Sequence, residues 1–357
     1  MFTCLKRKLE PSFDVPVKNM AEMHPQSSVS EPGASQDTKS SNHSDRNHKT
    51  ETFAQPSSIP PNPSKKLTPK LKSTCYPPPF IIHPLSTHLQ SIIILHGRGS
   101  SASAFGPPLL YTPVSSLQSQ TLHTAFPHAK FIFPTASKRR AVVYNRASIN
   151  QWFDNWSLTE PTEREELQIE GLRESSAYIH SLLREEIELV GAGNVVLGGL
   201  SQGCAASLVA LLMWEGEPLG AAFGMCGWLP FRKQMEEIAQ PRYDGDDEDD
   251  PFERSSQSKK FDPPAQAVEF LCEEVGASVV QPSMSFQRTP LFLGHGTEDG
   301  KVFLHLGREA ASCLRILGMH VSWTKYEGLA HWYSAAMLRD LVDFLQGLDL
   351  GSASGVK

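Results

Sequence analysis

A serine flanked by glycines is the residue of this chain whose surroundings point most directly to chemistry. Ser201 lies in the run Gly198–Gly203, which has the spacing Gly-x-Ser-x-Gly. Residues 194–197 before it form a short apolar run typical of a strand, and residues 204–212 after it favour a helix. A strained strand-to-helix turn of this kind holds a serine hydroxyl clear of the backbone, and its glycines avoid crowding by a Cβ. The alternative is a glycine-rich turn with a surface serine, but the strand and the helix around it favour a nucleophile.

A nucleophilic serine needs a base, and the base needs an acid that orients it. When these groups sit on a parallel sheet they lie at the carboxyl ends of the strands, in the chain order serine, acid, histidine. Asp299 follows the apolar run 291–294 and therefore falls at that edge. Two alternatives stay open from the residues alone. Asp299 is also a suitable cap for a helix beginning near Lys301, and its neighbour Glu298 is a second candidate acid.

Three histidines follow the candidate acid along the chain. His305 lies inside a helical run, and His320 precedes the apolar run 321–326, which places it at the opposite edge of the sheet. His331 comes after that run and reaches the same edge as Ser201. We therefore predict that His331 is the base.

The turn after the first strong apolar run is a candidate for holding a negatively charged oxygen. Residues 92–95 lead into His96-Gly97-Arg98-Gly99-Ser100. The glycines allow the backbone N–H of Arg98 to point at the site beside the N–H of Gln202, so that the two form an oxyanion hole. An ordinary glycine-rich turn is the alternative, whereas the spacing fits neither a dinucleotide-binding nor a P-loop motif.

The elements that must position these residues alternate between apolar strands and helical patterns. A long amphipathic helix is predicted over 163–190. The pattern predicts an α/β fold with a mainly parallel sheet and helices on both faces. The predicted strands lie at 91–95, 130–134, 194–197, 220–226, 290–296 and 321–326.

The domain boundaries follow from composition. Residues 1–75 are predicted to be a disordered N-terminal tail, because a polar segment of this kind buries too little to offset its ordering entropy. The folded domain is expected over 76–348, with an acidic insertion at 240–286 that carries a small helix near 264–275, and 349–357 form a C-terminal tail. The acidic run 244–250 lacks the ligand spacing of a calcium loop and is predicted to be solvated. No metal and no cofactor are expected.

Charge and targeting features limit the partners. The net charge of −6 argues against non-specific binding to nucleic acid. The N-terminus lacks the apolar segment of a secretory signal, no apolar run is long enough to span a membrane, and the six scattered cysteines suit free thiols, so a cytoplasmic protein is expected. Cys4 lies beside three basic residues and is a candidate for S-acylation, which would give at most reversible association with a membrane surface.

Six segments occur in an order and at a spacing that resemble a known family. They resemble the phospholipase/carboxylesterase family of α/β-hydrolases, the group that contains acyl-protein thioesterases, over residues 76–348 outside the insertion. The resemblance implies the α/β-hydrolase fold, a triad of Ser201, Asp299 and His331, and an oxyanion hole from the backbones of Arg98 and Gln202. The segments are Leu95-His96-Gly97-x-Gly99, Trp152-Phe153-Asp154, Gly198–Gly203, Gly227-Trp228-Leu229-Pro230, His295-Gly296-x-x-Asp299 and Tyr326-Glu327-Gly328-x-x-His331.

The resemblance also implies an activity, the hydrolysis of a carboxylic ester or thioester, with an acylated protein or a lysolipid as possible substrates. The loop of Trp152, Phe153 and Trp156 is expected to line the acyl entrance, and Trp228 to contact substrate. Arg98 departs from the apolar residue usual in the family, and it would favour an anionic substrate unless it points to solvent. The alternatives are another hydrolase chemistry on the same triad, such as a peptidase, and a non-catalytic α/β-hydrolase that binds a ligand or partner.

Overall fold

The structure is a computed structural model that describes residues 76–114, 120–157, 159–240, 262–276, 283–348 and 350–351. The predicted tail over 1–75 with Cys4, the acidic run 244–250 and most of the C-terminal tail lie outside the described residues.

One sheet of seven strands organises the described domain. Its strand order is β1-β3-β2-β6-β7-β8-β9, in which β1 runs antiparallel to β3 and every other neighbouring pair is parallel. This confirms the mainly parallel sheet expected from the alternating pattern. The strands are β1 (Phe80–Ile82), β2 (Gln90–Leu95), β3 (Ala129–Phe133), β6 (Val195–Leu200), β7 (Ala221–Met225), β8 (Leu291–Gly296) and β9 (Val321–Tyr326).

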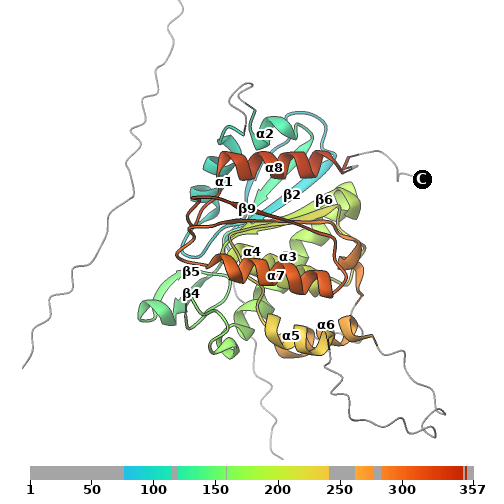
Figure 1. Ribbon diagram of the computed structural model, residues 1–357. Helices are drawn as coiled ribbons and strands as arrows, with labels where there is room; N and C mark the ends of the chain where they lie inside the picture. The colour runs from blue at the N-terminus through green and yellow to red at the C-terminus, as the bar shows by residue number, and fades with distance from the viewer. Residues whose placement is uncertain are drawn as a thin grey trace, which may run out of the picture. The chain divides into compact units, whose positions relative to one another are not determined.

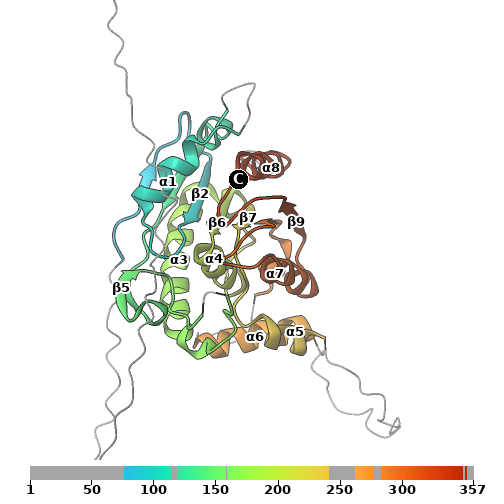
Figure 2. The same cartoon turned by 60° about the vertical axis from the view of Figure 1, so that its left-hand side comes forward.

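Helices cover both faces of the sheet (Figure 1). On one face lie α1 (Ala102–Tyr111) and α8 (Ala335–Gln346), and on the other lie α3 (Ile169–Val190), α4 (Gln202–Leu212) and α7 (Leu304–Ile316), as the turned view in Figure 2 also shows. A further pair, α5 (Arg232–Ala239) and α6 (Pro263–Val275), packs outside the second layer against α7 and α3. The short α2 (Leu122–Ala125) lies beside α1 and α8. Single 3₁₀ turns occupy Val142–Tyr144, Glu165–Leu167, Ala192–Asn194 and Ser285–Arg288.

The apolar run of β2 does not alternate with polar residues, because both faces of the strand are buried. Ile92 and Ile94 face the core under α1 and α8, whereas Ile93 and Leu95 face the core under α3 and α4. All four are at most 3% exposed. A parallel strand covered on both faces needs apolar side chains in both directions.

Three details differ from the sequence expectation. The helix predicted from residue 163 begins at Ile169, because the chain first makes a 3₁₀ turn after Arg164, whose φ is +50°. Helix α1 was not predicted, since Pro107 and Pro108 lie inside it and remove two backbone donors. A two-stranded ribbon of β4 (Lys138–Ala141) and β5 (Ala147–Asn150) was also missed, and its sequence lacks the apolar alternation of a half-buried strand.

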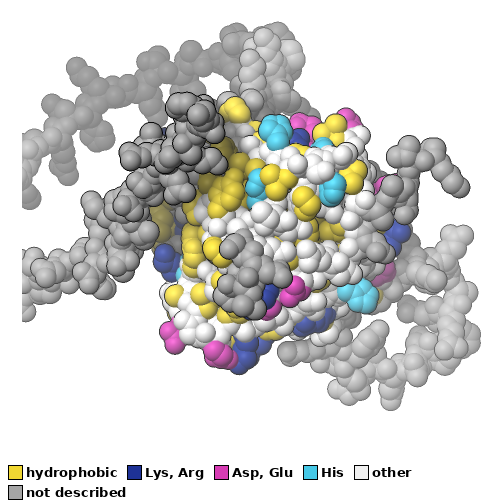
Figure 3. All heavy atoms as spheres, turned by 90° about the horizontal axis from the view of Figure 1, so that it is seen from above, with side chains coloured by type: hydrophobic (Ala, Val, Ile, Leu, Met, Phe, Trp, Pro, Cys, Tyr) yellow, Lys and Arg dark blue, Asp and Glu magenta, His cyan; other side chains and the backbone are white. Residues whose placement is uncertain are grey.

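Two features of the described residues bear on partners. No helix among the described residues combines the length and the apolar character that crossing a bilayer requires. Figure 3 shows the face on the side of α2 and α8, where the lysine and arginine side chains lie toward the margin rather than gathering in one area.

Candidate active site

Ser201 stands at a strained turn between β6 and α4. Its backbone φ of +57° and ψ of −122° lie outside the regions that residues other than glycine ordinarily adopt. A Cβ added at Gly199 would lie 2.4 Å from the carbonyl carbon of Gly203, and one added at Gly203 would lie 2.4 Å from the carbonyl oxygen of Leu95. Glycine is therefore required at both positions by backbone packing. The Ser201 N–H donates to the Met225 carbonyl at 2.8 Å, which ties the turn to β7.

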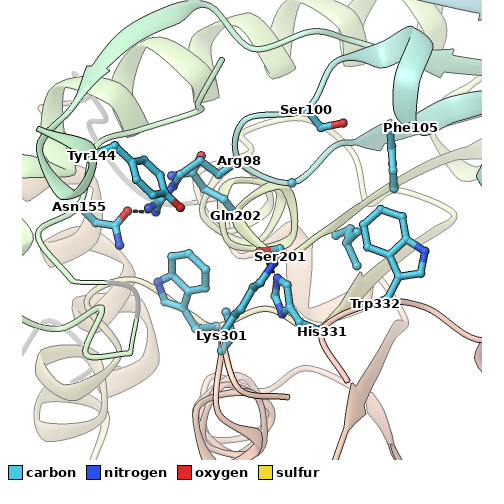
Figure 4. Close-up of a pocket in the computed structure, with 14 residues that line it drawn as sticks. Arg98, Ser100, Phe105, Tyr144, Asn155, Ser201, Gln202, Lys301, His331 and Trp332 are labelled. Carbon is cyan, nitrogen blue, oxygen red and sulfur yellow. Dashed lines mark hydrogen bonds between the residues drawn. The ribbon is translucent and has the colours of Figure 1, made fainter. Parts of the chain in front are cut away.

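The structure brings the three predicted site residues together at the carboxyl edge of the sheet. Ser201 Oγ lies 2.9 Å from His331 Nε2, and His331 Nδ1 lies 2.7 Å from Asp299 Oδ2. Figure 4 shows the His331 ring directed at Ser201. In this arrangement a histidine can accept the serine proton while its other nitrogen is held by a carboxylate.

Asp299 is enclosed by donors. Its Oδ1 accepts hydrogen bonds from the backbone N–H groups of Lys301 and Val302, both at 2.9 Å, so the capping role considered from the sequence coexists with the contact to His331. His295 Nε2 lies 3.2 Å from Asp299 Oδ2 and 2.8 Å from the Val302 carbonyl. Burial by itself raises the pKa of Asp299, but the hydrogen bonds from His295, His331 and Val302 outweigh it and hold that pKa well below its usual range. Asp299 is therefore ionised at neutral pH.

The competing candidates form none of the contacts that join Ser201, His331 and Asp299. Glu298 and His320 are exposed, and His305 is exposed with its ring stacked on Phe303. His295 is the group that sequence reasoning overlooked. The resemblance includes His295 in a motif but gives it no role, and its place four residues before Asp299 is the signal that could have identified it.

The turn that carries Arg98 is held by a buried histidine. His96 Nε2 accepts from the Ala136 N–H at 3.0 Å, so the proton resides on Nδ1, which donates to the Gly97 carbonyl at 2.7 Å. Burial lowers the pKa of His96 to about 4, and the ring is neutral. Among the described residues, no backbone hydrogen bond uses the N–H of Arg98, and Gln202 begins α4, where N–H groups have no acceptor within the helix. Both groups are available to a ligand.

Trp152 and Phe153 do not line the site, in contrast to the expectation that they contact substrate. Both are fully buried in the core between α3 and α4. The Trp152 N–H donates to Gln202 Oε1 at 3.0 Å, Gln202 Nε2 donates to the Phe153 carbonyl at 2.7 Å, and Trp152 Nε1 donates to the His96 carbonyl at 2.8 Å. These contacts brace the two turns that carry Gln202 and Arg98. The expectation failed because a loop sequence does not tell which way its aromatic side chains point.

A cavity of about 220 Å³ opens beside Ser201. Trp228 lines it as expected, whereas Trp156 lies in a separate surface depression with the Arg164 guanidinium 4.9 Å from its ring centre. Figure 4 shows the cavity divided by Ser201, with Arg98, Tyr144 and Asn155 on one side and Phe105 and Trp332 on the other. The complete lining is Gly97, Arg98, Ser100, Phe105, Tyr144, Asn155, Leu200, Ser201, Gln202, Trp228, Lys301, Val302, His331 and Trp332.

The described part of the chain contains no cluster of three or more histidine, cysteine or acidic side chains placed to hold a metal ion. Four cysteines are free and buried, namely Cys204, Cys226, Cys272 and Cys313, and burial raises the pKa of each thiol.

Comparisons with known proteins found a matching family model, similar curated proteins and a solved structure with the same fold. Residues 77–261 match the family model described as Phospholipase/Carboxylesterase. The chain is 24% identical to an acyl-protein thioesterase 1 of Yarrowia lipolytica over 264 residues, which cover 73% of this chain and 92% of that protein. It is 25% identical to the carboxylesterase SOBER1 of Arabidopsis thaliana over 268 residues, or 74% and 92% of the two chains. The crystal structure of Zea mays acyl-protein thioesterase 2 shares the fold, with a TM-score of 0.53 and 22% identity over 75% of this chain and 97% of that one.

Proposed function

Because this chain belongs to the phospholipase/carboxylesterase family of α/β-hydrolases, we propose that it cleaves carboxylic esters or thioesters through an acyl-enzyme formed on Ser201. Its similarity to acyl-protein thioesterases and a carboxylesterase supports a hydrolase of the thioesterase or carboxylesterase type. The observation that carries the mechanism is the continuous contact from Ser201 Oγ to His331, at 2.9 Å, and from His331 to Asp299, at 2.7 Å.

In the proposed mechanism His331 acts first as base and then as acid. His331 Nε2 takes the proton of Ser201 Oγ as that oxygen attacks the carbonyl carbon of the ester or thioester. The ionised Asp299 holds the proton on Nδ1 and stabilises the imidazolium. His331 then gives its proton to the departing alcohol or thiol, and a water molecule activated by the same nitrogen hydrolyses the acyl-enzyme. The base must be neutral to begin, so activity is expected to fall in acid.

The backbone N–H groups of Arg98 and Gln202 are proposed as the oxyanion hole. Both belong to turns that are braced by buried hydrogen bonds, those of His96 and those of the Gln202 side chain. Preorganised donors of this kind need no rearrangement as charge develops on the carbonyl oxygen. Loss of one such donor typically raises the barrier by about 2.7–4 kcal/mol.

The substrate is proposed to be an ester or thioester with a short acyl group. The cavity of about 220 Å³ is smaller than the roughly 300–1,000 Å³ of sites that enclose drug-sized ligands. An acylated protein or a lysolipid, the two substrates implied by the resemblance, would have to carry a short acyl group to fit this cavity. The free, buried thiols suit the proposed cytoplasmic location.

The test is labelling by a fluorophosphonate, combined with turnover of p-nitrophenyl esters and acyl thioesters of increasing chain length. The wild-type protein should label and turn over, with the rate falling as the acyl chain lengthens, and Ser201→Ala should do neither. Ser181→Ala is the matched control, because Ser181 Oγ only donates to the Tyr178 carbonyl on α3. A folded wild-type protein without labelling or turnover would favour the non-catalytic, ligand-binding alternative.

A further inference from the structure

The guanidinium of Arg98 is a buried cation in the wall of the cavity beside Ser201. One of its nitrogens, Nη2, donates to the side-chain oxygen of Asn155. The other two, Nε and Nη1, are inaccessible to solvent and have no hydrogen-bond partner. A buried donor without an acceptor is costly, typically by about 1–3 kcal/mol and by more for a charged group. Two of the three guanidinium nitrogens of Arg98 therefore lack an acceptor, in a side chain that forms part of the cavity wall.

Arg98 also lacks a counter-ion. Two other half-buried arginines of the domain pair with carboxylates, Arg139 with Glu174 and Arg232 with Glu309. No carboxylate of the described residues forms an ion pair with Arg98. Asp154 acts on it only at longer range, because that carboxylate accepts hydrogen bonds from the backbone N–H groups of Val142 and Asn155. Burial lowers the pKa of Arg98 to about 10, which leaves the group charged at neutral pH.

The surroundings of Arg98 reinforce its positive potential. The cavity lining contains Arg98, Lys301 and the candidate base His331, and it contains no aspartate or glutamate. The side chain of Tyr144 lies against the guanidinium on the same side of Ser201 (Figure 4), and its hydroxyl interacts with that guanidinium. The opposite side of Ser201 is aromatic, with Phe105 and Trp332 in edge contact at 6.4 Å between ring centres. One half of the cavity is thus cationic and the other apolar.

We propose that Arg98 binds an anionic oxygen group of the substrate, a carboxylate or a phosphate, so that the enzyme selects esters or thioesters that carry a negative charge near the scissile bond. The planar guanidinium can present two N–H groups to two oxygens of such a group at once. The anion takes no part in the covalent steps. It supplies the missing counter-ion and places the carbonyl carbon at Ser201. This inference rests on the proposed hydrolytic function.

The first experiment compares charged and neutral esters of the same shape. The p-nitrophenyl monoester of adipic acid is measured against its neutral methyl ester, which places the charge on the acyl side. The acetate of 4-hydroxyphenylacetic acid is measured against the acetate of its methyl ester, which places the charge on the alcohol side. The quantity compared is the ratio of kcat/KM for the charged ester to that for the neutral ester, taken within each protein variant. A general loss of activity, including any effect on the oxyanion hole, cancels in this ratio.

In at least one of the two ester pairs, Arg98→Met should lower this ratio by about 10- to 100-fold, the range for loss of hydrogen bonds to a charged group. Arg308→Met should leave the ratio unchanged, because Arg308 is exposed on α7 and the net charge changes equally. The ratio should also fall with added salt in the wild-type protein. Equal ratios in the wild-type protein and Arg98→Met for both pairs would overturn the proposal.

A second experiment separates failure of this proposal from failure of the hydrolase assignment. Adipate and inorganic phosphate are titrated by calorimetry into Ser201→Ala and into the double variant Ser201→Ala/Arg98→Met. Binding that depends on Arg98 supports the anion site even if the wild-type protein turns over no ester, and the anion that binds distinguishes carboxylate from phosphate. If the wild-type protein hydrolyses neutral esters, shows no preference for charge and binds neither anion, the hydrolase stands and the anion site fails. If it neither hydrolyses nor binds, both fail.

Discussion

At the scale of single residues, Asp299 combines two tasks in one carboxylate. One oxygen accepts from His331, and the other accepts from the backbone of the turn at Lys301 and Val302. Capping and orienting a histidine are often treated as competing explanations of such an aspartate. Here the capping contacts fix the carboxylate that the histidine needs.

Asp299→Asn should keep the fold and lose activity. An amide retains an oxygen for the backbone contacts, but it does not hold the proton on His331 Nδ1 as a carboxylate does. We expect kcat to fall by about 10⁴-fold, as for loss of the acid in comparable triads. The measurements are kcat for a p-nitrophenyl ester, which reports activity, and the midpoint temperature of thermal unfolding, which reports whether the fold is kept. Asp340→Asn is the control, since Asp340 accepts from the Tyr326 hydroxyl at 2.7 Å. Comparable activity in the two variants would argue against the role given to Asp299.

His96 should make the protein less stable in mild acid. Its pKa in the folded state is about 4, below the ordinary 6.5, because the ring is buried. The unfolded chain therefore takes up a proton between pH 6.5 and 4 while the folded chain does not, and stability falls as pH is lowered through this window. The loss from this one group amounts to at most about 3 kcal/mol.

The check is urea unfolding of the wild-type protein and of His96→Gln at pH 7 and pH 5. The variant should be less stable at pH 7, because the Nδ1 contact to Gly97 is lost, but its stability should fall less between the two pH values. His180, whose pKa burial also lowers, is present in both proteins and its effect cancels. An identical fall in both proteins would contradict the assignment.

At the scale of elements, the site depends on close approach between the β6–α4 turn and the end of β2. The two turns meet at Gly203, where a Cβ would lie 2.4 Å from the Leu95 carbonyl oxygen and 2.6 Å from that of His96. The same approach brings the turns that carry Gln202 and Arg98 together at the cavity beside Ser201. The proposed oxyanion hole therefore depends on the same close backbone packing at Gly203.

Gly203→Ala should separate these two turns and damage both stability and activity. The added methyl group meets backbone atoms that cannot move aside without shifting β2, so we expect a loss of about 1–3 kcal/mol and a large fall in fluorophosphonate labelling of Ser201. Gly193→Ala is the matched control, because nothing lies within 4 Å of the Cβ it would add. Urea unfolding and labelling rates check both effects. If Gly203→Ala unfolds and labels like the control, the close approach between the β6–α4 turn and the end of β2 is not needed.

At the scale of the whole domain, a buried polar contact joins a helix to the sheet. Glu186 of α3 accepts from the Ser91 hydroxyl at 2.7 Å and from Lys130 Nζ at 2.6 Å. The side chains of Lys130 and Glu186 are only 16% and 7% exposed. Such a pair specifies how α3 lies across β2 and β3, although an apolar pair of the same size would be comparably stable.

Lys130→Met should destabilise the domain by about 3–5 kcal/mol, since it leaves the carboxylate of Glu186 buried without its cation. Adding Glu186→Leu should restore most of the loss, because the uncompensated charge is removed. Lys325→Met, which breaks the exposed pair with Glu327, is the control and should change little. Free energies of unfolding in urea give the comparison. A double variant that is weaker than Lys130→Met would mean that the pair contributes net stability.

The sequence by itself determined the fold class and the chain positions of the candidate site residues. Apolar runs separated by helical patterns require a sheet that is covered on both faces, and the carboxyl ends of its parallel strands meet at one edge. That rule selected His331 over His320, and the helical pattern around His305 set that residue aside. The structure places His331 Nε2 2.9 Å from Ser201 Oγ.

Only the tertiary structure decided which side chains form the cavity. Trp152 and Phe153 point into the core, while Phe105 and Trp332, distant in the chain, meet beside Ser201. The burial of the Arg98 guanidinium without a counter-ion was equally beyond the sequence. The physical reason is that strand and helix periodicity is local, whereas the direction and solvation of a loop side chain depend on elements that pack against it from elsewhere in the chain.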